Sequence, residues 1–165
     1  MPAPTRTELL EAAKGFCDSF AQKRSLDEIL SHFSPGGEAG KEKKNDIIVL
    51  EHGLPRLAPF LGREFRGLEG AREYFETVGR YLSYEDMRFV EYVADADGEG
   101  EGEGGKVVAR GKARFTWTET SQSWDETFVY VLQFDECVKL TRYEVWADSG
   151  AAYLAARGEL AGAKA

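Results

Sequence analysis

The stretch that decides the fold of this chain runs Trp124-Asp-Glu-Thr-Phe-Val-Tyr-Val-Leu-Gln-Phe-Asp135. Large apolar side chains fall on one side of it, with a single glutamate among them: Trp124, Glu126, Phe128, Tyr130, Leu132 and Phe134. Alternation with a period of two is typical of a β-strand whose two faces meet different surroundings. A face this aromatic must be covered, and the helical first half of the chain is the material available to cover it.

More strands surround this one. From Lys106 to Asp148 the apolar residues recur mainly at alternate positions, and glycine and polar clusters divide the segment into three strands. Upstream, Ile47–Glu51 and Tyr84–Val93 also have strand character, and Pro59–Gly67 is an extended segment closed by glycine. The pattern predicts an antiparallel meander in the C-terminal part of the chain.

Helices are predicted mainly in the first half. Thr5 with Glu8, and Ser25 with Glu28, fit capping boxes, in which each side chain satisfies a free backbone N–H of the first helical turn. Apolar residues then recur at helical spacing over 9–20, 26–33 and 68–82, and a short fourth helix is expected after Asp148. Helices followed by a meander predict an α+β domain.

The length and charge of the chain narrow its class. Its 165 residues suit one domain, expected over 1–157, with a frayed tail over 158–165. The formal charge of −8 repels phosphate backbones, so nucleic-acid binding is not expected. No apolar run approaches the ~20 residues that a membrane span needs, so no membrane partner is expected either.

The cysteines and the N-terminus bear on location. Cys17 and Cys137 make neither a disulfide framework nor a zinc site, and we interpret both as small buried hydrophobic residues in a reducing compartment. Met1–Thr7 contains no hydrophobic segment followed by a small-residue cleavage site, so no secretory signal is expected. These features predict a cytoplasmic protein, and the spacing of its residues suggests no metal and no cofactor.

Two segments are predicted to be mobile loops. Glu38–Asn45 and Asp95–Gly105 are charged, contain glycine and have almost no apolar residues to bury. The second contains a G-x-G-x-x-G match from Gly100 to Gly105. We reject it as a nucleotide site, because its glutamates would repel phosphate and a strand follows where the motif requires a helix.

Two segments resemble a known family. The first is Pro59-Phe-Leu-Gly-Arg-Glu-Phe-Arg-Gly-Leu-Glu-Gly-Ala-Arg-Glu-Tyr-Phe75, and the second is Lys139-Leu-Thr-Arg-Tyr-Glu-Val-Trp-Ala-Asp148. Together with the order of elements, they resemble the nuclear transport factor 2-like superfamily, and within it the SnoaL-like (polyketide cyclase-like) branch. The resemblance covers roughly residues 7–153.

The resemblance implies a cone-shaped, curved antiparallel sheet wrapped over the N-terminal helices, a roll also described as cystatin-like. It implies an apolar cavity between the sheet and the helices, and dimers are common in this superfamily. Its members include isomerases, cyclases, dehydratases, epoxide hydrolases and binding proteins without activity, so the fold alone does not give the function. Catalytic members commonly place an Asp–His pair or a carboxylate base in the cavity.

The candidate catalytic residues are Glu144 and His52. Arg142, Glu144 and Trp146 share one face of the final strand, because alternate side chains point the same way. If that face is concave, Glu144 is a carboxylate in an apolar cavity; otherwise Arg142 and Glu144 form an ion pair facing solvent or another subunit. His52 ends a strand beside Gly53, where it either shuttles a proton or is a structural histidine.

The expected pocket lies between the first and third helices and the sheet. Its predicted lining is Phe16, Phe20, Tyr130 and Trp146, with Glu144, His52 and Arg142 as polar groups. Tyr130 lies in the middle of the aromatic strand, so its hydroxyl needs a buried partner or a ligand, although core packing alone also accounts for it.

Two functions compete. The first is a cofactor-independent isomerase, cyclase or dehydratase that transfers a proton on a small hydrophobic metabolite; the second is a binding or scaffold protein without activity. An enclosed cavity containing Glu144 or His52 favours the enzyme, and Glu144 on the outer surface favours the binding protein.

A homodimer is expected through the outer face of the sheet, where Val129, Val131, Tyr143 and Val145 are predicted to lie.

Overall fold

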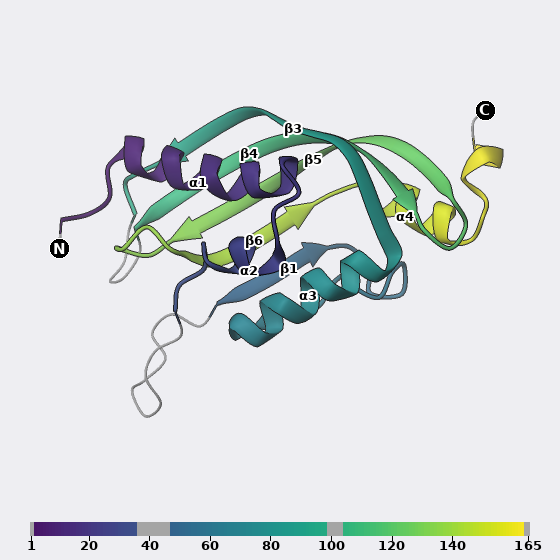
Figure 1. Cartoon of the computed structure of the whole chain (residues 1–165), viewed down its shortest axis with the longest axis horizontal. Coiled ribbons are helices and arrows are strands. Elements are labelled where there is room, and N and C mark those ends of the chain that lie inside the picture. The colour runs from purple at the N-terminus through teal and green to yellow at the C-terminus, as the bar shows by residue number, and fades with distance from the viewer. Residues whose placement is uncertain (1, 36–46, 99–103, 164–165) are drawn as a thin grey trace.

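The computed structural model describes residues 2–35, 47–98 and 104–163 (Figure 1). The elements in chain order are α1 (Arg6–Ala21), α2 (Leu26–Leu30), β1 (Ile48–His52), β2 (Phe65–Arg66), α3 (Gly67–Tyr81), β3 (Leu82–Asp95), β4 (Gly105–Trp117), β5 (Gln122–Phe134), β6 (Leu140–Trp146), α4 (Ser149–Ala156) and a 3-10 turn, η1 (Leu160–Ala163). The predicted loop Glu38–Asn45, and residues 99–103 of the predicted loop Asp95–Gly105, lie outside the described residues. None of the helices in the described part is long and apolar enough to cross a bilayer.

The strands form one six-stranded sheet in the order β2-β1-β6-β5-β4-β3. The long meander β3-β4-β5-β6 is antiparallel throughout, as predicted. β1 then pairs with β6 in parallel, so the sheet is mixed, and the expectation of a purely antiparallel sheet is corrected at this one pair. This pairing places Glu51 beside Val145 and joins the first strand to the last.

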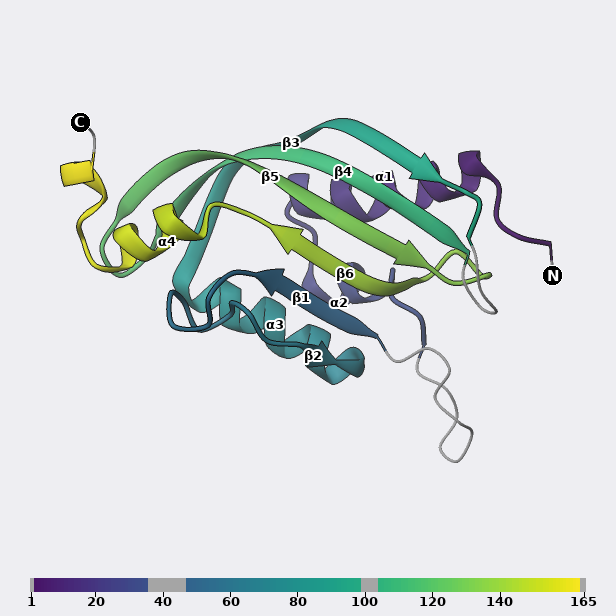
Figure 2. The ribbon, with the colours of Figure 1, turned by 180° about the vertical axis from the view of Figure 1, so that it is seen from behind.

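The curved sheet has one covered face and one open face. Helices α1, α2 and α3 lie against its inner face (Figure 1), and from behind the long strands stand in front of α1 and α2 (Figure 2). The inner positions of β5 are those of the aromatic alternation, from Trp124 to Phe134, and these residues are buried except for the half-buried Glu126. The α+β architecture predicted from the sequence is confirmed.

The helices begin where their caps predict. The Thr5 side chain accepts a hydrogen bond from the backbone N–H of Glu8 at 3.2 Å, and Glu8 accepts one from the backbone N–H of Thr5 at 2.7 Å. Ser25 caps α2 by accepting from the N–H of Glu28. α3 opens without a side-chain cap; instead Gly67 has a φ of 72°, a left-handed conformation that glycine adopts without a Cβ clash.

Strand β6 contains one extra residue relative to its partner. Phe134 pairs with Leu140 and Gln133 pairs with Arg142, so Thr141 has no partner and forms a bulge. As a result Leu140 and Tyr143 are both buried on the inner face although they are three residues apart. Strict alternation counted from Leu140 would place Arg142, Glu144 and Trp146 inside, whereas in the structure they face outward.

Candidate functional site

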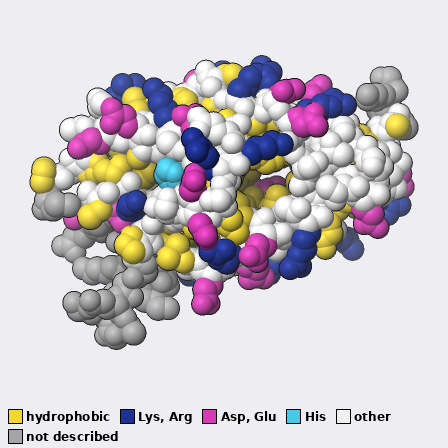
Figure 3. Space-filling view, in the orientation of Figure 1, with side chains coloured by type: hydrophobic (Ala, Val, Ile, Leu, Met, Phe, Trp, Pro, Cys, Tyr) yellow, Lys and Arg dark blue, Asp and Glu magenta, His cyan; other side chains and the backbone are white. Residues whose placement is uncertain are grey.

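A cavity of about 310 Å³ lies between the inner face of the sheet and the helices. Figure 3 shows the surface hollowed near its centre, with hydrophobic side chains inside the hollow and charged ones around it. Most of its walls are aromatic or aliphatic, and the aromatic members are Phe20, Phe60, Tyr74, Phe75, Tyr84, Phe115, Trp124, Phe128, Tyr130 and Tyr143. The cavity is therefore the kind of concave, mainly apolar site that takes small organic ligands.

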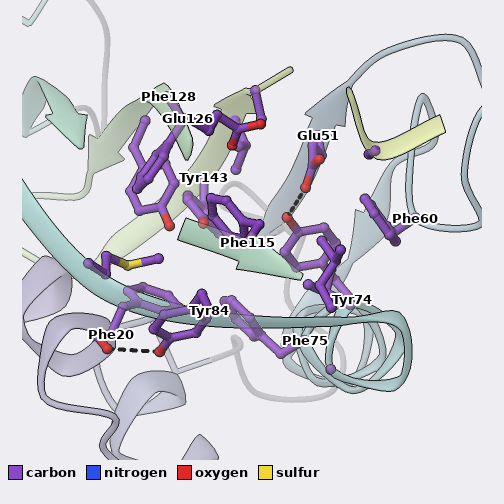
Figure 4. Close-up of a pocket in the computed structure, with 18 of the residues that line it drawn as sticks. Phe20, Glu51, Phe60, Tyr74, Phe75, Tyr84, Phe115, Glu126, Phe128 and Tyr143 are labelled. Atoms are coloured by element: carbon purple, nitrogen blue, oxygen red, sulfur yellow. Dashed lines mark hydrogen bonds between the residues drawn. The ribbon is translucent and has the colours of Figure 1, made fainter. Parts of the chain in front are cut away.

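Glu51 is the most buried carboxyl group of this cavity, with 8% of the residue exposed. It lies on the inner face of β1 because Ile47, Val49 and Glu51 alternate inward. The Tyr74 hydroxyl, from α3, donates a hydrogen bond to Glu51 Oε1 at 2.5 Å, and the two side chains meet at the cavity edge (Figure 4). Among the described residues, no hydrogen bond reaches the second oxygen of Glu51.

The protonation of Glu51 follows from its surroundings. Burial raises the pKa of Glu51 from its ordinary value of 4.5 to about 7, and the nearby charge of Glu126 acts in the same direction. The hydrogen bond from Tyr74 lowers this pKa but is outweighed. Burial also raises the pKa of Tyr74 well above its ordinary value, so Tyr74 remains the donor. Near neutral pH, Glu51 can therefore either hold or take a proton.

Glu126 is a second carboxyl group in the cavity, on the inner face of β5. Its Oε1 accepts hydrogen bonds from Trp124 Nε1 at 3.1 Å and from the backbone N–H of Asp148 at 2.9 Å. Burial raises its pKa more than these two bonds lower it, and the charge of Asp148 raises it further. Asp148 also lines the cavity and caps α4 by accepting from the N–H of Ala151.

Tyrosine hydroxyls line the wall beside these carboxyl groups. Tyr130 on β5 and Tyr143 on β6 meet edge to face, with ring centroids 4.9 Å apart, and burial raises the pKa of both hydroxyls well above the ordinary range. Tyr130 therefore faces the cavity and is also packed on the core, the two alternatives raised from the sequence. Neutral hydroxyls of this kind can donate a hydrogen bond to a ligand oxygen.

The two phenylalanines predicted for the pocket occupy different places. Phe20 lines the cavity. Phe16 is fully buried and lies behind it, packed edge to face on Phe20 and Tyr143 with centroids 5.0 and 5.2 Å apart. Phe16 therefore supports the wall and does not form it: it lies one turn before Phe20 on the same face of α1 and is covered on all sides.

Glu144, His52, Arg142 and Trp146 lie together on the outer face of the sheet, and none of them lines the cavity. Their expected placement in the pocket is corrected, and the bulge at Thr141 is the reason. His52 Nε2 lies 2.9 Å from Glu144 Oε1, and Arg142 Nε lies 3.0 Å from Glu144 Oε2. The His52 ring stacks on Trp146 with centroids 3.9 Å apart. Of the two alternatives given for the final strand, the structure shows the second: Arg142 and Glu144 form an ion pair that faces away from the cavity.

The electrostatics of the outer cluster are those of a satisfied ion pair. Burial alone would raise the pKa of Glu144, but the hydrogen bonds and charges of Arg142 and His52 outweigh it and hold the pKa below its ordinary value. A carboxylate held ionised by two partners is a poor proton carrier near neutral pH. The catalytic roles inferred for Glu144 and His52 depended on a place in the cavity that they do not occupy.

Sequence reasoning missed Glu51 and Tyr74 and did not use Glu126. The two glutamates had a signal: Glu51 continues the inward alternation of Ile47 and Val49, and Glu126 stands among the aromatic residues of the central strand. Tyr74 lies within the segment that resembles the family, but nothing in the sequence places its hydroxyl against Glu51. Across the described ranges, no group of three or more His, Cys, Asp and Glu side chains is arranged to hold a metal ion.

Comparisons with known proteins bear on the fold. No protein-family model matches the chain, and no curated protein matches it. Among solved structures, an NTF2-like protein of unknown function from Burkholderia pseudomallei is similar with a TM-score of 0.67 and 15% identity, over 90% of this chain and 96% of the other. A candidate isomerase from Bacillus subtilis gives a TM-score of 0.66 at 10% identity, over 92% and 94% of the two chains.

A third neighbour represents the branch suggested by the sequence. A candidate SnoaL-like polyketide cyclase from Mesorhizobium loti is similar with a TM-score of 0.54 and 14% identity, over 83% of this chain and 97% of the other. Identities this low establish the shared fold. The chain therefore has the fold of the nuclear transport factor 2-like superfamily, with the SnoaL-like branch among its structural neighbours, as the segments Pro59–Phe75 and Lys139–Asp148 predicted.

Proposed function

We propose that this chain is a cofactor-independent enzyme that moves a proton on a small hydrophobic metabolite, in a reaction of the isomerase, cyclase or dehydratase type. The observation that carries the proposal is Glu51, a buried carboxyl group with a pKa of about 7 and one oxygen free of hydrogen bonds among the described residues. Glu126 stands near enough for its charge to raise that pKa. Proton transfer needs two such groups, one that holds a proton and one that takes it.

The chemistry assigns complementary roles to the two carboxyl groups. Trp124 and the Asp148 backbone hold one oxygen of Glu126 and leave the other to act as a base toward a ligand. Glu51 donates its own proton at a second position of the same ligand, and Tyr74 keeps its carboxyl group oriented. After product leaves, Glu126 gives its proton to water and Glu51 takes one from water, which restores the starting state. The hydroxyls of Tyr130 and Tyr143 are placed to stabilise charge that develops on a ligand oxygen.

The experiment follows proton transfer without knowing the natural substrate. The protein is incubated in heavy water with a panel of apolar cyclic ketones and enones, and deuterium incorporation at carbon is measured by mass spectrometry. Glu51→Gln and Glu126→Gln are each expected to lower the exchange rate on the best substrate by roughly 100-fold or more. Glu11→Gln, an exposed substitution on α1, is the matched control and keeps the wild-type rate. Exchange that survives both pocket substitutions would contradict the proposal.

A binding protein without activity is the second candidate. It is favoured by the outward position of Glu144, the outcome that was expected to favour a binding protein. It is also favoured by the position of both histidines, because neither His32 nor His52 lines the cavity, so no Asp–His pair is present there. In that case a ligand bound in the cavity takes up no deuterium at carbon in heavy water. Glu51→Gln then changes only the affinity of the protein for the ligand. A cytoplasmic location belongs to either candidate and is supported by the unpaired Cys17 and Cys137. Cys17 is buried as expected, whereas Cys137 is exposed, so the expectation that both are buried is wrong for Cys137.

We also propose that two copies of the chain pair through the outer face of the sheet. Support comes from the exposed Val93, Val108 and Trp146, which are 55%, 37% and 43% accessible, and Val108 pairs with both Val93 and Val131 across neighbouring strands. Tyr143 and Val145, expected on this face, lie on the inner one, so the surface is smaller and more polar than predicted.

Sedimentation tests the dimer. At micromolar concentration the wild-type protein is expected at twice the mass of the 18.4 kDa chain. Val108→Glu places a charge in the centre of the apolar row and is expected to give the monomer, with an unchanged far-ultraviolet spectrum. A wild-type protein that sediments only as the monomer would refute this proposal.

A further inference from the structure

The charged groups of the cavity are nearly all of one sign. Four carboxyl groups belong to its lining, those of Glu51, Glu76, Glu126 and Asp148. Among the described lining residues the one cationic side chain is Arg24, whose guanidinium is half exposed, donates to Gln22 and lies 3.9 Å from Glu28. The interior therefore offers no fixed positive charge to a ligand.

The inner carboxyl groups also repel one another. The charge of Glu126 raises the pKa of Glu51, and the charge of Asp148 raises that of Glu126. Each of the first two has one oxygen engaged by protein donors, Tyr74 for Glu51 and Trp124 for Glu126. A positive charge placed between them would relieve this repulsion and use their remaining oxygens, whereas a negative charge would increase it.

Aromatic rings surround the carboxyl groups. Phe115 stacks on Trp124 with centroids 6.0 Å apart and meets Phe128 edge to face at 5.9 Å, next to Glu126 on β5. The faces of such rings attract cations, most strongly in dry surroundings. A cation that enters the cavity therefore exchanges its water for ring faces and carboxylate oxygens, while its hydrocarbon body buries apolar surface against the same walls.

We propose that the ligand of this cavity is a protonated amine on an apolar ring or chain, with its ammonium group held between Glu51 and Glu126. This inference rests on the proposed function in that it takes the same cavity as the substrate site, and it adds the charge of the substrate. Each free carboxylate oxygen has two lone pairs, so it can hold the ammonium group and still exchange a proton with the ligand. It excludes carboxylates, phosphates and sulfates as substrates, because Arg24, the one cation among the described lining residues, is half exposed and already engaged by Gln22, and the acids repel anions.

Matched ligand pairs of equal size test the charge. The pairs are 2-phenylethylamine with 2-phenylethanol, and tryptamine with 3-(2-hydroxyethyl)indole; 3-phenylpropionate is the anionic probe. Binding is followed at pH 8 by titration calorimetry and, for the phenyl probes, by the tryptophan fluorescence of the protein, to which Trp124 in the cavity wall contributes. At this pH the amines keep their proton, as a lysine side chain does, and Glu51 is largely ionised.

The wild-type protein is expected to bind each amine roughly tenfold or more tightly than its alcohol, and to show no binding of 3-phenylpropionate. Glu126→Gln and Glu51→Gln should each reduce the preference for the amine by roughly tenfold, while Glu11→Gln leaves it unchanged. The comparison of amine with alcohol uses only the wild-type protein, so it tests the inference even if a variant fails to fold.

Other outcomes overturn the inference in distinguishable ways. Equal affinity for amine and alcohol, or binding of 3-phenylpropionate, refutes the charge of the ligand while a binding cavity still stands. If no probe binds and no exchange is found in heavy water, both this inference and the proposed function fail.

Discussion

Two glutamates, one on each face of the sheet, show how differently neighbouring positions behave. Glu51 is paired with Val145 across β1 and β6, so it lies one residue along the ladder from Glu144. Glu51 faces inward to Tyr74 and has a raised pKa; Glu144 faces outward to His52 and Arg142 and has a lowered one. The direction of the side chain, and not its position along the chain, decides whether the pKa of the carboxyl group is raised or lowered.

The opposite pKa shifts of Glu51 and Glu144 also have opposite consequences for the stability of the fold. A carboxyl group whose pKa is raised in the folded state resists ionisation there. The free energy of unfolding therefore decreases as the pH rises from the pKa of the unfolded chain to that of the folded chain. A carboxyl group with a lowered pKa favours folding above its ordinary pKa and loses that contribution as pH falls. Ionised Glu51 on the inner face therefore destabilises the fold, and ionised Glu144 on the outer face stabilises it.

The largest effect is expected for Glu51→Gln. Between pH 4.5 and about 7 the unfolded chain loses its Glu51 proton while the folded chain keeps it, so the wild-type free energy of unfolding decreases with pH. Glutamine has no such penalty and can still accept from Tyr74. The variant should exceed the wild type by up to roughly 3 kcal/mol at pH 8 and by less than about 1 kcal/mol at pH 5. Urea unfolding at both pH values measures this, and a variant less stable at pH 8 would contradict it.

Tyr74→Phe should have an intermediate effect of the opposite sign. It removes the donor to Glu51, so the pKa of Glu51 rises further and the ionised form becomes more costly. We expect a loss of about 2 kcal/mol at pH 8 and about 1 kcal/mol at pH 5, measured by the same urea titrations. Equal stability of wild type and variant at pH 8 would show that the hydrogen bond carries no energy.

The smallest effect is expected for Glu144→Gln. Its partners Arg142 and His52 are each about one-third exposed, and pairs of this kind contribute about 0.5–1 kcal/mol. The pKa of Glu144 is lowered in the folded chain. The variant should therefore have a smaller free energy of unfolding than the wild type above pH 4.5, and this difference should vanish as the pH falls through the pKa of Glu144 in the folded chain. Thermal unfolding from pH 3 to 8 tests this. Loss of deuterium exchange in this variant would restore Glu144 as a catalytic candidate.

Most of the fold was accessible from the sequence, because alternation and helix caps are local signals. The aromatic strand from Trp124 to Phe134 and the box of Thr5 with Glu8 were located from their own residues. The parallel pairing of β1 with β6 was not, because it joins segments about ninety residues apart, as in the pair Glu51 and Val145. No local pattern carries that information.

The site was harder to predict because its polar groups depend on register. One unpaired residue, Thr141, changes the parity of β6, and with it the face taken by Glu144. The more apolar alternation of Tyr143 and Val145 was the better guide to the inner face. The contact of Tyr74 with Glu51 joins a helix to a strand and could come only from the three-dimensional arrangement.

The bulge at Thr141 also affects how reliably the chain reaches its fold. The bulge shifts the register of β6 on β5 by one residue, and a slip of one residue in the strand beyond it turns every side chain there over. In the slipped register Arg142 and Glu144 would enter the dry cavity, and Tyr143 would lie in water. The large penalty for burying those charges selects against the misfolded form. The ion pair that adds little to native stability thus protects the fidelity of folding.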